Sequence, residues 1–311
     1  MNPKLKPLAK SAIGMFHRLA LRAGVVVVPN HYYTPVADVN QLRQFKKSWA
    51  KRSSMLGVDM DVAAQGNVLR EMVKRYEPEI RGNAPFREGA AKCFGPGFGY
   101  IEAQCLHGVL RALKPRRIFE VGSGVSTYCA LHAISLNEKE GHHTDITCIE
   151  PHPSNFLREI RNKKINLLEK PVQELDPDFF LGLEAGDLFF IDSTHAIKPG
   201  GDVIYLYLEV IPRLKPGVIV HIHDIFLPYL YQRDLLQVRT LFQWSETALL
   251  LALLTFNSRL SVLFSLSLLH YDAPEVLSDI FPEYLPQPAE NGLCEWAAAG
   301  YFPSSLYLRT S

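Results

Sequence analysis

The sequence is poor in cysteine and contains no long uninterrupted apolar run. Its 311 residues include only five cysteines, which are scattered and odd in number: Cys93, Cys105, Cys129, Cys148 and Cys294. No pair has C-x-x-C spacing, which argues against a disulfide framework or a structural zinc site and favours a reducing compartment. The longest apolar stretch, residues 247–270, is interrupted by Asn257 and Arg259 and predicts a buried helix followed by a strand. We therefore expect a cytoplasmic protein without a signal peptide.

The sequence also has almost no net charge, because 33 basic residues balance 32 acidic ones. This balance, together with the lack of a recognisable base-reading motif, argues against a nucleic-acid partner. The distribution is uneven, since residues 1–55 hold ten lysines and arginines but only one acid, Asp38. Such a segment predicts either an arm that lies on the acidic body of its own protein or a peripheral membrane contact through residues 1–55.

Residues 8–23 have the rough periodicity of an amphipathic helix. Its apolar positions are Ala12, Met15, Phe16, Leu19 and Leu21. Two interpretations remain open: a helix packed on the main domain, or a helix that lies on a membrane surface. We expect residues 1–94 to form a basic, mostly helical extension that serves as a lid, a dimerisation element or a membrane dock. The main domain would then cover residues 95–311.

From residue 95 onward, short apolar runs alternate with helical segments and show no internal repeat. The predicted strands are residues 117–121, 146–150, 165–168, 187–191, 218–223, 260–265 and 305–309. The predicted helices are residues 100–113, 126–136, 154–162, 201–212 and about 243–255, with an earlier one at 66–80. Such alternation is typical of βαβ units with right-handed crossovers. The sequence therefore predicts an α/β fold with a doubly wound, mostly parallel, seven-stranded sheet.

The first predicted strand runs into a glycine-rich turn at residues 120–124, EVGSG, which leads into a helix. Glycines let a ligand approach the backbone closely, and the helix N-terminus offers free N–H groups. A dinucleotide fingerprint would need a third glycine, where the chain has Thr127. The carboxylate of Glu120 would also repel a pyrophosphate, so the turn suits a ligand that carries a cation.

Polar residues also follow the second and third predicted strands. Glu150 ends the second strand, where a carboxylate can accept hydrogen bonds from both hydroxyls of a ribose. Together with the glycine-rich turn, it predicts a nucleoside site. Gln173, which follows the third strand, either flanks an adenine ring or belongs to a plain polar loop.

The ends of the next two predicted strands carry four polar residues: Asp192, His195, His223 and Asp224. These two strands should be neighbours in the sheet, so the four side chains should gather. Mixed nitrogen and oxygen donors can bind a divalent cation or carry out acid–base chemistry. The alternative is structural, because a strand-end aspartate can also orient a cofactor or cap the next helix.

These motifs resemble those of class I S-adenosylmethionine-dependent methyltransferases. The resemblance rests on EVGSG at 120–124, Glu150, GDLFFID at 186–192 and LKPGVIVHIHD at 214–224, and it covers roughly residues 95–311. It implies a Rossmann-like methyltransferase fold and S-adenosylmethionine as the cofactor. The implied cofactor site comprises Glu120, Gly122, Ser123, Gly124, Glu150, Gln173 and Asp192.

The D-x-x-H motif at residues 192–195, followed by an acidic end of the fifth strand, is similar to the metal-dependent sugar O-methyltransferases of the macrocin type. This similarity implies that Asp192 and Asp224 bind a metal and that His195 is the general base. The chain has His223 where that pattern has an aspartate. A nitrogen donor at His223 suits magnesium less than manganese, iron or zinc, so Mg²⁺, Mn²⁺ and a metal-free site all remain open. A base role also requires His195 to be mainly neutral near pH 7.

The leading interpretation is an S-adenosylmethionine-dependent O-methyltransferase. Its acceptor would be a small hydroxylated molecule such as a carbohydrate or a lipid-linked glycan. One alternative is a metal-dependent oxygenase-like or hydrolytic enzyme built on His221, His223 and Asp224, because H-x-H places two imidazoles on the same side of a strand. Another is a non-catalytic, membrane-associated binding protein. The sequence leaves open whether the chain forms a homo-oligomer.

Overall fold

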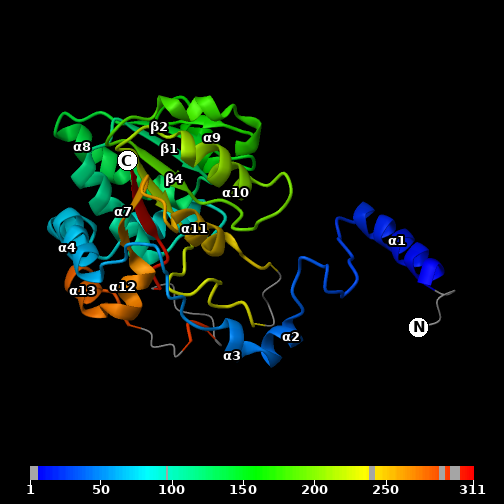
Figure 1. Ribbon diagram of the computed structural model, residues 1–311. Coiled ribbons are helices and arrows are strands. Elements are labelled where there is room, and N and C mark those ends of the chain that lie inside the picture. The colour runs from blue at the N-terminus through cyan, green and yellow to red at the C-terminus, as the bar shows by residue number, and fades with distance from the viewer. Residues whose placement is uncertain (1–5, 96, 238–241, 287–290, 295–301) are drawn as a thin grey trace. The chain divides into compact units, whose positions relative to one another are not determined.

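The computed structural model describes residues 6–95, 97–237, 242–286, 291–294 and 302–311 (Figure 1). The chain divides into two compact units, Met1–Trp49 and Ala50–Ser311, and each is described by itself. Residues 50–94 belong to the same unit as the sheet, because the helices in this stretch pack on later helices and on β6. The boundary between the two units therefore falls between residues 49 and 50, within the extension predicted over residues 1–94.

The first unit contains the helices α1 (Lys6–Arg22), α2 (Val39–Gln44) and α3 (Lys46–Trp49). The helix predicted over residues 8–23 is confirmed by α1, and the following residues 25–30 have no regular secondary structure. None of the helices that the structure describes combines the length and the apolar character needed to span a membrane. The cytoplasmic location stays a prediction.

The second unit is built on a seven-stranded sheet in the order β3-β2-β1-β4-β5-β7-β6. Its strands are β1 (Arg117–Val121), β2 (Asp145–Ile149), β3 (Asn166–Leu168), β4 (Leu188–Ile191), β5 (Ile219–Ile222), β6 (Leu260–Ser265) and β7 (Leu306–Thr310). The first five strands pair in parallel, whereas β7 runs antiparallel to both β5 and β6. This arrangement confirms the predicted α/β fold with a mostly parallel seven-stranded sheet.

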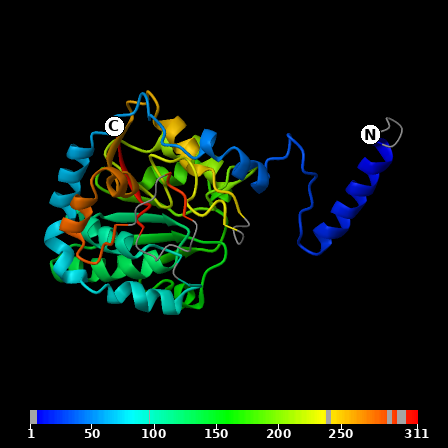
Figure 2. The same ribbon diagram turned by 90° about the horizontal axis from the view of Figure 1, so that it is seen from below.

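Helices cover both faces of the sheet (Figure 2). The first face carries α4 (Val62–Val73), α6 (Ala84–Lys92), α7 (Tyr100–Leu113), α8 (Val125–Lys139), α9 (Asn155–Ile160), α12 (Leu266–Asp272) and α13 (Pro274–Ile280). Adjacent strand residues alternate between two cores, so Phe190 packs on this face and Phe189 on the other. Figure 1 shows α4, α12 and α13 gathered at one side of the unit, where they contact one another.

The second face carries shorter helical segments. They are η2 (Val172–Glu174), η3 (Pro177–Gly182), α10 (Asp202–Tyr205), the π turn η4 (Leu206–Val210), η5 (Ile211–Arg213) and α11 (Glu246–Leu254). Residues 201–212 were expected to form one helix, but the chain passes from α to π to 3₁₀ geometry before β5. Pro212 lacks a backbone N–H and cannot extend an α-helical ladder, which fits the change at this point.

Three parts of the second unit depart from the sequence prediction. The helix predicted over residues 66–80 begins earlier, with α4, and continues through η1 (Lys74–Tyr76) and α5 (Glu77–Ile80). The helix α6 was not predicted. The apolar run continues past β6 as the helix α12, which was not predicted. Its N-cap is Ser265, whose hydroxyl accepts a hydrogen bond from the backbone N–H of Leu268.

Candidate functional site

The glycine-rich turn after β1 brings the ends of three strands together. Gly122 has φ +78°, and a Cβ atom at this position would lie 1.8 Å from the backbone oxygen of Asp192 after β4. Its N–H donates to the carbonyl of Ile149, the last residue of β2. Gly122 therefore has to be glycine for both conformational and steric reasons.

Glu120 lies beneath this turn instead of beside a cavity. Its carboxylate accepts hydrogen bonds from the hydroxyls of Ser126 at 2.6 Å and Thr127 at 2.5 Å. Burial raises the pKa of Glu120 to about 7, although these hydrogen bonds act in the opposite direction. Thr127 also accepts a hydrogen bond from the N–H of Gly124, so it closes the turn where a dinucleotide fingerprint would have glycine. Glu120 thus fixes the turn, and its direct contact with the cofactor stays a prediction.

Glu150 lies where the sequence predicted a ribose-binding carboxylate. It lines a cavity of about 530 Å³ together with Gly122, Gln173 and Asp192. Its two oxygens accept hydrogen bonds from the N–H groups of Ser123 at 3.2 Å and His152 at 2.7 Å. A carboxylate has about four lone-pair positions, so it can still accept hydrogen bonds from two hydroxyls. The predicted residues of this half of the site therefore converge, with Gln173 exposed on the cavity wall and Ser123 contributing its backbone.

The four polar residues after β4 and β5 also come together. Atoms of Asp192, His195 and His223 that can bind a metal all lie within 4.8 Å of one another. The carboxylate of Asp192 is 3.1 Å from Nδ1 of His223 and 3.3 Å from Nε2 of His195. The carboxylate of Asp224 lies 3.6 Å from Nε2 of His195 and 3.5 Å from Nδ1 of His223. This group, the polar cluster, is able to bind a divalent cation.

Two further carboxylates, which sequence reasoning missed, complete the polar cluster. Glu246 on α11 lies 2.7 Å from Nδ1 of His195, and Glu102 on α7 lies 3.2 Å from Nε2 of His223. Both carboxylates are buried. Only weak signs in the sequence indicate that these two acids belong to the site. Glu102 is the acid in an otherwise largely apolar helix, and Glu246 resembles an ordinary acid in the first turn of a helix.

The carboxylates control the protonation of the imidazoles. Burial alone would lower the pKa of His195, but its hydrogen bonds to Asp192 and Glu246 and the charges of Glu246 and Asp224 raise it to about 10. The pKa of His223 is raised in the same way against the effect of burial, chiefly by Asp224, Glu102 and Asp192. The prediction that His195 is mainly neutral near pH 7 is therefore wrong for the protein without a bound cation.

His221 does not join the polar cluster. Its ring is stacked between Phe190 and Tyr307, with 4.1 Å between ring centroids on either side. Its Nε2 lies 2.8 Å from the hydroxyl of Ser305, and the residue is fully buried. Among the residues that the structure describes, the group able to share a metal ion does not include His221. The predicted site of His221, His223 and Asp224 is therefore not formed.

A second cavity, of about 680 Å³, opens over the polar cluster. The cluster residues Glu102, Asp192, His195, His223 and Asp224 line one side. Aromatic and further polar residues line the rest, among them a buried arginine: Phe98, Phe226, Trp244, Phe302, Arg233, Asp234, Gln237, Cys294 and Ser304. Asp192 lines both this cavity and the one beside Glu150, so the two cavities meet at the end of β4.

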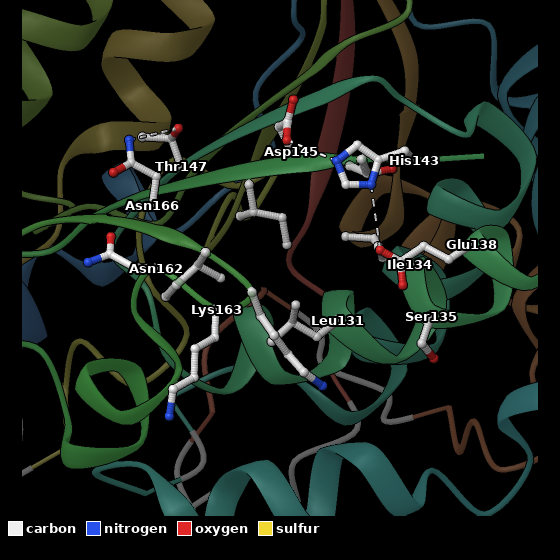
Figure 3. A pocket seen from close by; sticks show the side chains of 14 residues that line it. Leu131, Ile134, Ser135, Glu138, His143, Asp145, Thr147, Asn162, Lys163 and Asn166 are labelled. Atoms are coloured by element: carbon white, nitrogen blue, oxygen red, sulfur yellow. Dashed lines mark hydrogen bonds and ion pairs between the residues drawn. The ribbon is translucent and has the colours of Figure 1, made fainter. Parts of the chain in front are cut away.

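Another cavity, of about 710 Å³, lies at the opposite end of the strands (Figure 3). It is lined by the beginnings of β2 and β3 and by α8. Figure 3 shows His143 between Asp145 and Glu138, at 3.1 and 3.7 Å. Ligands of parallel α/β sheets bind outside the carboxyl ends of the strands, so this cavity does not belong to the candidate site.

Comparisons with known proteins agree with the geometry. A family model described as a methyltransferase domain matches residues 119–225. No curated protein matches the chain.

Two solved structures are similar to this chain. One is assigned as a protein-L-isoaspartate O-methyltransferase of Plasmodium falciparum in complex with S-adenosyl-L-homocysteine, with 16% identity and a TM-score of 0.27. That alignment covers 38% of this chain and 59% of the other, so the chain spans less than two thirds of that protein. The other is assigned as a methyltransferase of Thermobifida fusca, with 8% identity, a TM-score of 0.34 and coverage of 86% and 97%. The seven-stranded sheet itself is of the Rossmann-like α/β type. The match of residues 119–225 to the methyltransferase domain model supports S-adenosylmethionine as the cofactor.

Proposed function

We propose that the chain is an S-adenosylmethionine-dependent O-methyltransferase that acts on a sugar or another small hydroxylated molecule with the help of a divalent cation. The observation that carries the proposal is the pair of cavities that meet at Asp192. One cavity has the carboxylate that suits a ribose, and the other has the buried acids and imidazoles that suit proton transfer. Such adjoining sites would bring a cofactor and an acceptor together, and positioning supplies much of the acceleration of a displacement reaction.

The residues of the first cavity fit the cofactor. Glu150 would accept hydrogen bonds from the ribose hydroxyls, and Gln173 would lie beside the adenine. Gly124, at which a Cβ atom would meet nothing within 4 Å, leaves the backbone open to close approach by the methionyl part. When bound, S-adenosylmethionine supplies a methyl group on a cationic sulfur, which the nearby carboxylate of Asp192 would favour electrostatically.

The polar cluster fits a divalent cation. Four carboxylates face only two imidazoles, so acids outnumber bases in the cluster. Glu102 and Glu246 are buried, and Asp192 and Asp224 are partly buried. Asp192 and His223, whose donor atoms lie within 4.8 Å of one another, would hold the cation together with Asp224, which lies 3.5 Å from His223. The nitrogen donor favours Mn²⁺ over Mg²⁺. Such a cation would supply positive charge next to the oxygen of the acceptor.

His195 is placed to act as the general base. Glu246 holds Nδ1, which leaves Nε2 directed at Asp192 and Asp224. Neutralising these two carboxylates removes part of the charge that raises the pKa of His195. The imidazole would then lose its proton near neutral pH, and Nε2 would accept the proton of the attacking hydroxyl.

Two measurements on one set of proteins test this function. Calorimetric titration with S-adenosylmethionine should show binding that weakens about tenfold or more in Glu150→Ala and stays unchanged in Glu159→Ala, an exposed acid on α9. Transfer of a labelled methyl group to a panel of sugars and other hydroxylated compounds should require Mn²⁺ or Mg²⁺ and stop in EDTA. A folded protein that binds no S-adenosylmethionine would overturn the proposal.

A further inference from the structure

A buried arginine in the wall of the acceptor cavity lacks the partners that such a group normally has. The side chain of Arg233 lines this cavity, and the residue is 7% exposed. The N–H groups of its Nε and Nη1 atoms donate no hydrogen bond to any of the described residues. No ion pair between Arg233 and a carboxylate is found among the described residues, and the guanidinium group lies over the ring of Phe302.

Arg111 shows how the same molecule treats a buried arginine that has a structural role. It is 4% exposed, and its guanidinium group forms ion pairs with Glu79 at 2.7 Å and Glu140 at 2.5 Å. It also donates a hydrogen bond to Asn137. A buried charge without such partners is costly, so the state of Arg233 calls for an explanation.

An aromatic wall connects Arg233 to the candidate base. The ring of Trp244 lies 4.7 Å from the ring of His195, and Phe226 lies 6.2 Å from Trp244. Phe302 follows, stacked at 6.1 Å on Phe226, and the guanidinium carbon of Arg233 lies 4.0 Å above the Phe302 ring. A ring-shaped acceptor could lie against this wall, with a hydroxyl at one end and another group at the other.

We propose that the acceptor is an anionic compound whose carboxylate or phosphate group binds Arg233 while its hydroxyl faces His195. The inference rests on the proposed function, because the cavity is taken as the acceptor site. A guanidinium group offers paired N–H donors that match the oxygens of a carboxylate or phosphate. The acids of the polar cluster line the opposite side of the same cavity, so they would direct such a group toward Arg233.

The test compares the full chain with Arg233→Met, in the presence of S-adenosylhomocysteine and at constant ionic strength. Inorganic phosphate, glucuronate and uncharged glucose serve as probes, and the thermal unfolding midpoint reports their binding. In the wild type, glucuronate or phosphate should raise the midpoint at concentrations where glucose does not. In Arg233→Met, the concentration of anion needed for the same shift should rise at least tenfold. Arg213→Met, which changes an exposed arginine, is the matched control and should behave like the wild type.

The outcomes separate this inference from the proposed function. Without anion, Arg233→Met should have a midpoint equal to or above that of the wild type, because the substitution removes an unpaired buried charge. Equal anion effects in the wild type and Arg233→Met, or no anion effect in either, would overturn the inference. S-adenosylhomocysteine binding is measured calorimetrically on the same samples: its loss in the wild type would contradict the proposed function, whereas its presence without anion binding would contradict only the role of Arg233.

A second inference, carried by a different region, concerns α1. At about 100° per residue, Ala12, Met15, Phe16 and Leu19 share one face of this helix, and Arg22 and Arg18 lie beside it on the flank next to Met15. The side chains of Met15, Phe16 and Leu19 are exposed, with Phe16 at 60%. We infer that this face binds the surface of an anionic lipid bilayer, because an apolar face flanked by basic residues is the pattern of an interfacial helix. The ten basic residues within residues 1–55 supply the charge complementarity.

Flotation of the full chain with vesicles tests this surface. Vesicles of phosphatidylcholine mixed with phosphatidylserine should carry the chain, and phosphatidylcholine alone or high salt should reduce binding. Phe16→Glu should abolish flotation. Leu21→Glu introduces the same charge on the polar face and should weaken flotation much less. Equal losses in the two variants, or no flotation on the anionic vesicles, would overturn the inference.

Discussion

The ends of β1 and β2 and the ends of β4 and β5 lie next to one another on one edge of the sheet but are built differently. The first half, with Gly122 and Glu150, consists of residues close in sequence, and Glu150 is bonded mainly by backbone N–H groups. The second half is a cluster of acids and imidazoles that bond to one another across long stretches of chain. In the first half, the fixed carboxylate of Glu150 can accept hydrogen bonds from a neutral part of a ligand. The second has excess negative charge and is suited to a cation and to a proton.

Replacing His195 tests the chemical role of the second half. His195→Gln should reduce methyl transfer by roughly 10²–10⁴-fold, because proton transfer by a positioned base contributes on that order. The cofactor site does not include this side chain, so calorimetric binding of S-adenosylmethionine should stay unchanged. Normal turnover in the variant would show that His195 is not the base.

Gly122→Ala should damage both halves at once, because a Cβ atom would collide with the backbone of Asp192. We expect affinity for S-adenosylmethionine and for Mn²⁺ each to fall roughly 10–100-fold, in line with the cost of local backbone strain. Gly14→Ala is the matched control, since Gly14 lies in α1, outside the candidate site, and no atom lies within 4 Å of a Cβ there. Both affinities are measured by calorimetry. If both variants retained both affinities, the close contact between the halves would not matter.

The excess charge of the second half should make stability depend on pH. The pKa of His195 rises from 6.5 to about 10 on folding, so its ion pairs stabilise the fold fully below pH 6.5. This contribution is lost as the pH rises toward 10, on the order of a few kcal/mol together with His223. Urea unfolding in EDTA between pH 6 and 10 should show this decrease, and His195→Gln should flatten it. A wild-type free energy of unfolding that stays constant over this range would contradict the assigned pKa.

The smallest effect on activity should come from replacing His221, which lies in β5 and outside both halves of the site. His221→Phe keeps the stacking with Phe190 and Tyr307 but loses the hydrogen bond to Ser305. We expect turnover within about threefold of the wild type and a loss of about 1 kcal/mol of stability. A large loss of activity in a stable variant would return His221 to the reacting centre.

Much of the fold could be predicted from the sequence, because its strands are short apolar runs bounded by turns. β1 and β6 were predicted to the residue, and the other strands to within a few residues. The helix α12 was missed because the apolar run continues across Ser265 while the backbone changes from strand to helix. Apolar character alone does not report that change of periodicity.

The first half of the site could also be predicted, since the turn of Gly122 and the acid Glu150 carry local signals. The second half could be predicted only in part, from the residues that directly follow β4 and β5. Glu102 is 121 positions from His223, and Glu246 is 51 positions from His195. Their place in the site depends on how α7 and α11 pack against the sheet, and no local pattern encodes that. The protonation of His195 was misjudged for the same reason, because these distant acids help to set it.

The most direct test is a pair of calorimetric titrations, with S-adenosylmethionine and with Mn²⁺, on the wild type, Glu150→Ala and Asp224→Asn. If the two halves have separate roles, Glu150→Ala should weaken S-adenosylmethionine binding at least tenfold and leave Mn²⁺ binding unchanged. Asp224→Asn should do the reverse. The account would be contradicted if the folded wild type bound neither ligand, or if each substitution weakened both ligands equally.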